Sequence, residues 1–410
     1  MCHRLQLRLG LALSRLARLS LALLGIVLAL SISSWSYEER SDVQQPPKLS
    51  VITVCPEGPP ACQFRQIQDA INAAPEGSST TDYIPPAKII VAPGIYEENL
   101  VIFKSVILQG AGRDQVILRP RPGGGSETIA IVTVVGNIAP VYLEISGFTF
   151  QQASDRGGAV GINLVGQFWH SFIHENRFQN SIAGIRLTYS ASVIIHDNLF
   201  EGGEFGGSGI TIVDSFLNIK VIENTFLNLR KYLGSVAGIG IYASRGRFSK
   251  GSDIILANNN LRNISGYGII VYDSVGVKIR GNTVESALIG IMVYDFSEAV
   301  SIENNWVRGQ LAHGISISYS SAVINGNLIE ENQGHGIEIW KGEMERAPAV
   351  ELLQNQIFRN MQFGIWSERV EYVTACRYNQ LKENKAGDYA TGPITEPQPS
   401  PELKQKCEGK

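Results

Sequence analysis

The sequence of 410 residues carries little charge: only 18% of its residues are Asp, Glu, Lys or Arg, whereas 44% are hydrophobic. This balance argues against intrinsic disorder, which requires low hydrophobicity and high charge. With 35 basic and 38 acidic residues the formal net charge is −3, so the strong basic field that holds a nucleic-acid backbone is absent. The composition therefore predicts a folded chain without a nucleic-acid partner.

Long apolar runs are missing after the first 36 residues, so no later segment is long enough to span a bilayer. The N-terminus itself has a basic leader with four arginines, an apolar run over residues 19–32, and small residues around Ser34 and Ser36. This order is typical of a secretory signal peptide, and an uncleaved anchor is the alternative. We expect a signal peptide over residues 1–36 and a linker over 37–50. The protein is then exported to the periplasm, the cell surface or the medium, with no membrane contact after cleavage.

Cysteines are few, and Cys2 is lost with the leader. The remaining four, Cys55, Cys62, Cys376 and Cys407, allow three pairings. Proximity favours Cys55–Cys62 and Cys376–Cys407, each of which would fasten one end of the chain in an oxidising compartment. No Cys-x-x-Cys spacing or nearby histidine supports a zinc site, and no metal is assigned.

Two short signals recur through the middle of the chain at intervals of about 22–30 residues. The dipeptide Gly-Ile begins at Gly161, Gly184, Gly209, Gly238, Gly268, Gly290, Gly314, Gly336 and Gly364. An asparagine followed two residues later by an apolar side chain interleaves with it, at Asn176, Asn198, Asn224, Asn259, Asn282, Asn305, Asn327, Asn355 and Asn379. Each unit is too short for a strand-helix-strand crossover, and its residues alternate as strands do.

The repeat predicts an all-β solenoid with three short strands per coil, whose coils stack about 4.8 Å apart. In such a stack, equivalent turn asparagines hydrogen-bond one another in a ladder that satisfies buried backbone and amide groups. We therefore interpret the nine asparagines as structural.

Solenoid ends need covers, because the last coil exposes core and unpaired strand edges. Residues 63–74 place apolar side chains at a period of 3.6, which predicts an amphipathic capping helix at the N-terminal end. We expect a single domain over residues 51–385, a Pro-rich polar tail over 386–410, and a monomer.

Three segments carry a resemblance to a known family: QIQDAINAA at 66–74, IVAPGIYE at 90–97 and VILQGAG at 106–112. They resemble the opening of pectinesterase-type right-handed parallel β-helices, and the repeats are similar to those of the pectin-lyase-like superfamily over residues 51–383. The resemblance implies that fold with its N-terminal capping helix, but the superfamily hosts esterases, lyases, epimerases and non-enzymes alike.

The catalytic motifs of the superfamily are missing. Pectinesterase motifs are absent, and so is the Asp-Pro-His signature of mannuronan epimerases. Gly334-His335-Gly336 matches the Gly-His-Gly of polygalacturonases, but their paired aspartates are missing. No catalytic residue is therefore carried over.

Outward positions of the Gly-Ile strands form columns along the stack. One column aligns Tyr242, Tyr272, Tyr294 and Trp340, and Trp366 lies beside it. Sugar rings stack on such rings, so we predict a polysaccharide partner bound by Tyr242, Tyr272, Tyr294, Trp340, Trp366, Glu338 and Arg369. The alternative is that aromatic residues merely favour strands and stabilise cross-strand pairs.

A neighbouring column supplies candidates for catalysis. Asp273 and Asp295 fall on adjacent coils, where paired carboxylates recruit a cation such as calcium. With Tyr319, Lys341 and His335 they could assist elimination from a polyuronate. His313 and His335 should also stack, giving two of the ligands of a metal site. The alternative interpretation is that all of these are ordinary turn residues.

We therefore predict an exported protein that binds, and in one version processes, an extended polysaccharide along one parallel sheet. No cofactor is required, with calcium as the one candidate ion. One alternative is a non-catalytic structural or protein-binding surface β-helix. The other is a calcium-assisted lyase or carbohydrate esterase with an unfamiliar site.

Overall fold

The computed structural model describes residues 49–76, 85–121, 130–152, 160–203, 207–215, 217–230, 237–244, 253–341, 346–393 and 395–408. The expected signal peptide and almost all of the expected linker lie outside these ranges. The chain from Leu49 onward forms one compact unit.

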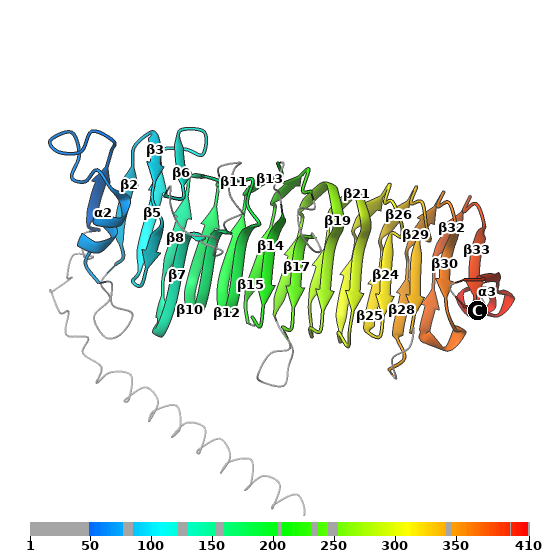
Figure 1. The fold of residues 1–410 in the computed structure, drawn as a ribbon. Helices are drawn as coiled ribbons and strands as arrows, with labels where there is room; N and C mark the ends of the chain where they lie inside the picture. Colours follow the sequence, from blue (N-terminus) through cyan, green and yellow to red (C-terminus); the bar gives the residue numbers. More distant parts are fainter. Residues whose placement is uncertain are drawn as a thin grey trace, which may run out of the picture. The chain divides into compact units, whose positions relative to one another are not determined.

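This unit is a parallel β-helix, whose strands pair with equivalent strands one coil away (Figure 1). Three parallel sheets, here called A, B and C, run along it, and several long strands bend from one sheet into the next. The expected three strands per coil and the all-β fold are confirmed.

Sheet A contains the strands that precede the ladder asparagines. Its members in order are β1 (Val51–Val54), β2 (Ala87–Val91), β5 (Val106–Gly110), β8 (Leu143–Ser146), the end of β10 (Val160–His174), the end of β12 (Ala183–His196), β15 (Ile219–Ile222), β18 (Ile254–Ala257), β20 (Lys278–Arg280), β22 (Val300–Glu303), β25 (Ser321–Asn325), β28 (Ala349–Leu353) and β31 (Val373–Arg377).

Sheet B follows each asparagine turn. It contains β3 (Gly94–Glu97), β6 (Val116–Arg119), β9 (Thr149–Gln151), β11 (Arg177–Gln179), β13 (Leu199–Glu201), β16 (Thr225–Leu227), the start of β19 (Asn260–Tyr272), the start of β21 (Thr283–Tyr294), β23 (Trp306–Arg308), β26 (Leu328–Glu330), β29 (Gln356–Phe358) and β32 (Gln380–Lys382).

Sheet C contains the Gly-Ile strands. It comprises β4 (Leu100–Ile102), β7 (Ala130–Val141), the starts of β10 and β12, β14 (Ser208–Val213), β17 (Ala237–Tyr242), the ends of β19 and β21, β24 (Ile315–Ser318), β27 (Ile337–Trp340), β30 (Phe363–Ser367) and β33 (Gly387–Thr391).

The core is a stack of identical layers. Phe178, Phe200 and Phe226 of sheet B are almost fully buried, and successive ring centroids lie 4.8 and 4.6 Å apart. Their size explains the recurring glycine of sheet C: a Cβ atom on Gly184 would lie only 2.5 Å from Phe200 Cδ1. Glycine thus recurs because a core side chain of sheet B, aromatic at Phe200 and aliphatic in later coils, packs directly against the backbone.

The predicted asparagine ladder is present at the turn between sheets A and B. All nine predicted residues take part. From Asn198 onward, each Oδ1 accepts from the backbone N–H and the side-chain amide of the preceding member, whereas Asn176 Oδ1 accepts the N–H of Phe148. For example, Asn282 Oδ1 receives both bonds of Asn259 at 2.9 Å. The repeated amide therefore satisfies groups that would be costly to bury alone.

The N-terminal end is capped as expected. Helix α2 (Ile67–Ala73) buries Ile67, Ala70 and Ile71 against the core. It begins later than the predicted residue 63, because Glu98 receives the N–H groups of Ile67 and Gln68 at 2.8 and 3.0 Å and fixes the first turn there.

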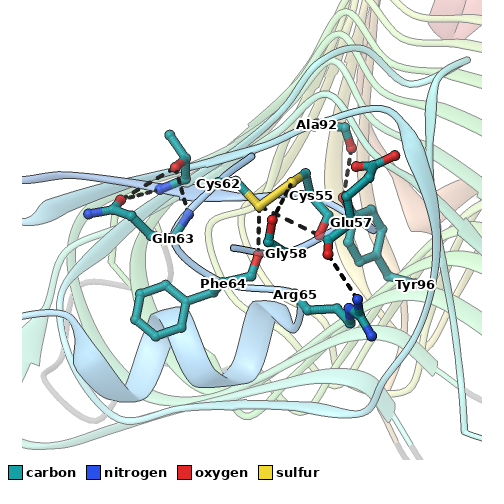
Figure 2. The surroundings of a disulfide bond; sticks show 10 residues. Cys55, Glu57, Gly58, Cys62, Gln63, Phe64, Arg65, Ala92 and Tyr96 are labelled. Atoms are coloured by element: carbon teal, nitrogen blue, oxygen red, sulfur yellow. Dashed lines mark hydrogen bonds between the residues drawn. A yellow bond between two sulfur atoms is a disulfide. The ribbon is translucent and has the colours of Figure 1, made fainter. Parts of the chain in front are cut away.

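The segment before α2 contains the first of the two expected disulfides, Cys55–Cys62. Figure 2 shows the Cys55–Cys62 bond at the loop that leads into the helix. In the same view Gln63 accepts the N–H of Thr53 at 2.8 Å, and Arg65 donates to the carbonyl of Glu57 at 2.9 Å. Gln66 itself is extended, with a φ of −108° and a ψ of 140°, so the helix begins only after it.

The C-terminal end differs from the expected polar tail. Residues 386–410 contain β33, the short antiparallel β34 (Gln398–Pro399) and helix α3 (Pro401–Glu408), and η1 (Val370–Tyr372) precedes β31. Leu403 of α3 is fully buried, and the second expected disulfide, Cys376–Cys407, ties α3 to β31. Within this polar, Pro-rich composition, Tyr389, Ala390, Leu403 and Cys407 are buried and make the segment a cap.

Candidate functional site

The outward face of sheet C brings the predicted aromatic column together. Ile269 and Val271 alternate into the core, so Tyr272 points outward from the strand. Tyr242 is the register partner of Tyr272, which in turn is opposite Tyr294. The ring centroids are 6.3 Å apart in the first pair and 5.8 Å in the second.

The column continues without a gap toward the C-terminal end. Ser318 interrupts it in sequence, but Tyr319 fills the space, 5.6 Å from the Tyr294 ring and 5.7 Å from the Trp340 ring. We call the set Tyr242, Tyr272, Tyr294, Tyr319 and Trp340 the aromatic ridge. All are half-buried except Tyr319, of which only 5% is exposed, so this predicted catalytic residue is a packing member of the ridge.

Three phenol groups of the ridge, those of Tyr242, Tyr272 and Tyr294, are held neutral. Burial raises the pKa of the Tyr242 and Tyr294 hydroxyls above the usual range. A hydrogen bond to Asp295 raises the pKa of the Tyr272 hydroxyl. The ridge therefore keeps hydroxyl donors over the whole physiological pH range.

A second ladder, which the sequence analysis missed, anchors the ridge. Six buried serines follow sheet C at its turn into sheet A: Ser190, Ser215, Ser244, Ser274, Ser297 and Ser320. From Ser215 onward, each hydroxyl oxygen accepts the backbone N–H of the preceding member at 3.0–3.3 Å. The hydroxyls in turn donate to carbonyls just upstream, including those of Tyr242, Tyr272 and Tyr294. The signal was a serine two or three residues after each outward position.

The serine ladder also explains the predicted acidic column. Asp273 and Asp295 each stand between a ridge tyrosine and a ladder serine, with φ of 45° and 55°. Aspartate tolerates this left-handed conformation better than most residues. Both carboxylates border the ridge on adjacent coils, as predicted.

The remaining candidates lie along the face rather than at one point. The backbone N–H of Lys341 donates to Glu368 at 2.6 Å. Arg369 is exposed and pairs with Glu371 at 3.6 Å. Within the described ranges no three His, Cys, Asp or Glu side chains are grouped as a metal site requires.

Two predicted substrate contacts are corrected by burial. Glu338 is only 3% exposed, and its carboxylate accepts from Ser316 Oγ at 2.6 Å and faces His313 Nε2 at 3.2 Å. Trp366 is fully buried against Phe363 and Ala390. Both side chains point away from the core. At Trp366, however, β33 adds a further strand with Ala390 opposite, so the outward-facing side chain is not exposed to solvent.

The predicted histidine stack is present, with His313 and His335 centroids 5.2 Å apart. His313 Nδ1 accepts the N–H of His335 at 3.0 Å, and His335 Nδ1 accepts the N–H of Phe363 at 3.3 Å. Nδ1 is thus occupied in both rings, and the remaining proton of each neutral ring is on Nε2. Burial lowers the pKa of both, to about 3 for His335. A third ladder, Gln310–Asn332–Asn360–Asn384, lies beside them.

Comparisons with known proteins agree on the architecture. The family model described as "Right handed beta helix region" matches residues 142–284 and 235–348, half of the chain, in keeping with the predicted handedness. An uncharacterized Bacillus subtilis protein, YclG, is 29% identical over 88 residues, which are 20% of this chain and only 15% of that protein.

Solved structures are similar at low identity. The Streptococcus pneumoniae surface protein and adhesin PfbA has a TM-score of 0.50 and 11% identity, over 74% of this chain and 91% of that one. The A-module of the Azotobacter vinelandii mannuronan C-5 epimerase AlgE6 has a TM-score of 0.46 and 15% identity, over 79% and 90%. At these identities the likeness concerns the fold alone. No described helix has the length and apolar character of a membrane span.

Proposed function

The chain belongs to the right-handed β-helix family, and we propose that it is an exported protein that binds an extended polysaccharide along the aromatic ridge. The observation that carries this proposal is the unbroken series of ring contacts from Tyr242 to Trp340. Aromatic rings offer large apolar faces with a polar tip, which suits the C–H faces and hydroxyls of sugars.

The repeat supports an extended ligand rather than a compact one. Ridge residues come from successive coils about 4.8 Å apart, so the rings form a line on which consecutive sugars of one chain would find equivalent contacts. Neutral tyrosine hydroxyls and the carboxylate of Asp295 border this line and provide hydrogen-bond donors and acceptors for sugar hydroxyls.

Export is supported by the two disulfides at the ends of the β-helix. Such bonds form and persist in oxidising compartments and are rare in the cytosol.

The proposal is tested by removing three ridge rings together, as Tyr272→Ala, Tyr294→Ala and Trp340→Ala in one variant. A panel of acidic and neutral polysaccharides is passed over immobilised protein, and retention is measured. At about 1 kcal/mol per lost ring contact, retention of the bound polymer should fall roughly 100-fold. The matched control removes two rings from outside sheet C, Trp306→Ala and Tyr378→Ala, which are 36% and 78% exposed.

Unchanged retention in the triple variant, with folding verified by circular dichroism, would contradict the proposal. Mass spectrometry of the retained polymers, with and without calcium, tests whether the protein also chemically modifies the polysaccharide that it binds. Unsaturated fragments would indicate a lyase, and lost acyl or methyl groups an esterase. If no polymer is retained and pull-downs yield one protein, the protein-binding alternative replaces glycan binding.

A further inference from the structure

A half-buried arginine, Arg186, has no counter-charge among the described residues and stands on the outward face of sheet C, toward the N-terminal end of the ridge. Arg186 lies on β12 between its register partners Asn163 on β10 and Thr211 on β14. Ile185 and Leu187 are fully buried, so alternation directs Arg186 outward. Within the part of the chain that the structure describes, its guanidinium donates no hydrogen bond and joins no ion pair.

Several arginines on a strand of sheet B, or directly after one, have carboxylate partners. Arg177 pairs with Glu201 at 3.1 Å, and Arg359 pairs with Glu331 at 3.1 Å. A guanidinium stays charged at any physiological pH, so Arg186 loses part of its hydration, and no described residue compensates as a charged partner. A ligand that brings a carboxylate or a sulfate would supply the missing partner, because the planar fork matches two anionic oxygens at once.

The described residues next to Arg186 bring no negative charge that pairs with it. Its register partners Asn163 and Thr211 are uncharged and half-buried. Asp214 occupies the turn one coil away, and among the described contacts it forms no ion pair with Arg186. Asn163 and Thr211 add neutral hydrogen-bonding groups of the kind that sugar hydroxyls use.

Two exposed rings lie further along the same two strands, Tyr189 on β12 and Trp169 on β10. Tyr189 and Trp169 are 47% and 48% exposed, and both lie at the turn from sheet C into sheet A. Tyr189 has a φ of 52° directly before a ladder serine, the same turn position and the same φ as Tyr319. Since Tyr319 joins the ridge from that position, Tyr189 and Trp169 are placed to extend the ring surface toward the N-terminal coils.

We propose that Arg186 binds an anionic substituent, a carboxylate or a sulfate, on the polysaccharide that lies along the aromatic ridge, with Tyr189 packing against the sugar that carries it. This inference rests on the proposed function and narrows its ligand from polysaccharides in general to acidic ones. It assigns recognition of the charge to the N-terminal part of the face, several coils from Lys341 and Arg369.

The test measures the affinity of the full chain for four polymers by affinity electrophoresis. Polygalacturonate and dextran sulfate carry the two candidate anions, and carboxyl-reduced polygalacturonate and dextran are their neutral counterparts. Arg186→Gln should weaken binding of one or both anionic polymers about 10- to 100-fold, as expected for a lost charge-assisted bond, and should leave the neutral polymers unaffected. Arg186→Lys should recover only part of the loss. Arg280→Gln, an exposed arginine on sheet A, is the control and should bind as the wild type does.

Each of the other outcomes refutes either the role of Arg186 alone or both proposals. Equal binding of the anionic polymers by wild type and Arg186→Gln, or an equal loss with the neutral ones, refutes the role of Arg186 and leaves the ridge standing. If the wild type binds only the neutral polymers, the role of Arg186 is likewise refuted and glycan binding along the ridge still stands. No binding of any polymer refutes both proposals. A large fall in the thermal midpoint of Arg186→Gln would show that the guanidinium has a structural partner, which also overturns the inference.

Discussion

The buried histidine stack makes the fold sensitive to mild acid, and His335 is the group to test. Its ordinary pKa is about 6.5, and burial together with the neighbouring His313 lowers it to about 3 in the folded protein. On acidification the unfolded chain therefore takes up a proton that the folded chain does not. The stability that depends on neutral His335 is complete above pH 6.5 and is lost as the pH falls from there toward 3.

The magnitude follows from the width of that window. Each pH unit between the two pKa values costs about 1.4 kcal/mol of folding free energy. Between pH 7 and pH 5 the loss from His335 alone is about 2 kcal/mol. Protonation at Nδ1 would also break the bond from Phe363 N–H, which is now 3.3 Å long. His313 shifts in the same direction and adds to the loss.

The assay is urea unfolding at pH 7, 6 and 5, followed by far-ultraviolet circular dichroism and by tryptophan fluorescence. Trp366 stacks on His335 with centroids 5.4 Å apart, so its emission should report the same transition. His335→Asn removes the titrating ring and should lose about 2 kcal/mol less than wild type between pH 7 and 5. His196→Asn keeps His335 and should follow the wild-type dependence. Equal losses in wild type and His335→Asn would refute the buried neutral imidazole.

Two further predictions concern the ladder and the ends. Asn282→Ala should cost about 3–5 kcal/mol in urea unfolding, because it leaves the buried backbone N–H of Asn259 and one proton of its side-chain amide without a partner. Asn263→Ala, at an exposed amide with a φ of 56° that alanine tolerates poorly, should cost only about 1 kcal/mol, and a similar cost for both would contradict the ladder's role. Cys407→Ser should lower stability by about 3–4 kcal/mol because its bond closes 31 residues. Cys62→Ser, which opens a span of 7, should cost about 1 kcal/mol less, and the reverse order would argue against the loop-closure account.

The fold was predictable because two structural features, the turn asparagine and the sheet C glycine, use one residue type in successive coils. At each of these coils the turn asparagine bonds a backbone N–H, a side-chain amide and a backbone carbonyl. The sheet C glycine in turn always meets a core side chain. Both residues therefore recur with a period that is visible in the sequence. Cysteine proximity identified both disulfides for a similar reason, since each closes a short span at one end.

The serine ladder escaped detection because serine is common and its spacing varies with the turn. Ser274 follows Tyr272 by two residues, but Ser297 follows Tyr294 by three because Phe296 is inserted. A strict period search therefore misses it, although the hydrogen-bond pattern is regular.

The errors in the site have one physical cause. Alternation along a strand tells which side chains leave the core, but it does not tell what lies over them. Glu338 and Trp366 leave the core as predicted, yet both are nearly inaccessible. The cover comes from His313 and from the C-terminal segment that includes Ala390, which are distant in sequence or were expected to form a tail.

The serine ladder bears directly on binding, because it fixes the backbone from which the ridge rings project. The hydroxyls of Ser244, Ser274 and Ser297 hold the carbonyls of Tyr242, Tyr272 and Tyr294, and each ring also rests on its neighbour. Rings held in this way have little conformational freedom left to lose when a ligand arrives. A polysaccharide laid along them would therefore keep most of the stacking free energy as affinity, which is the reason to expect the ridge, rather than the exposed rings of the other sheets, to dominate binding.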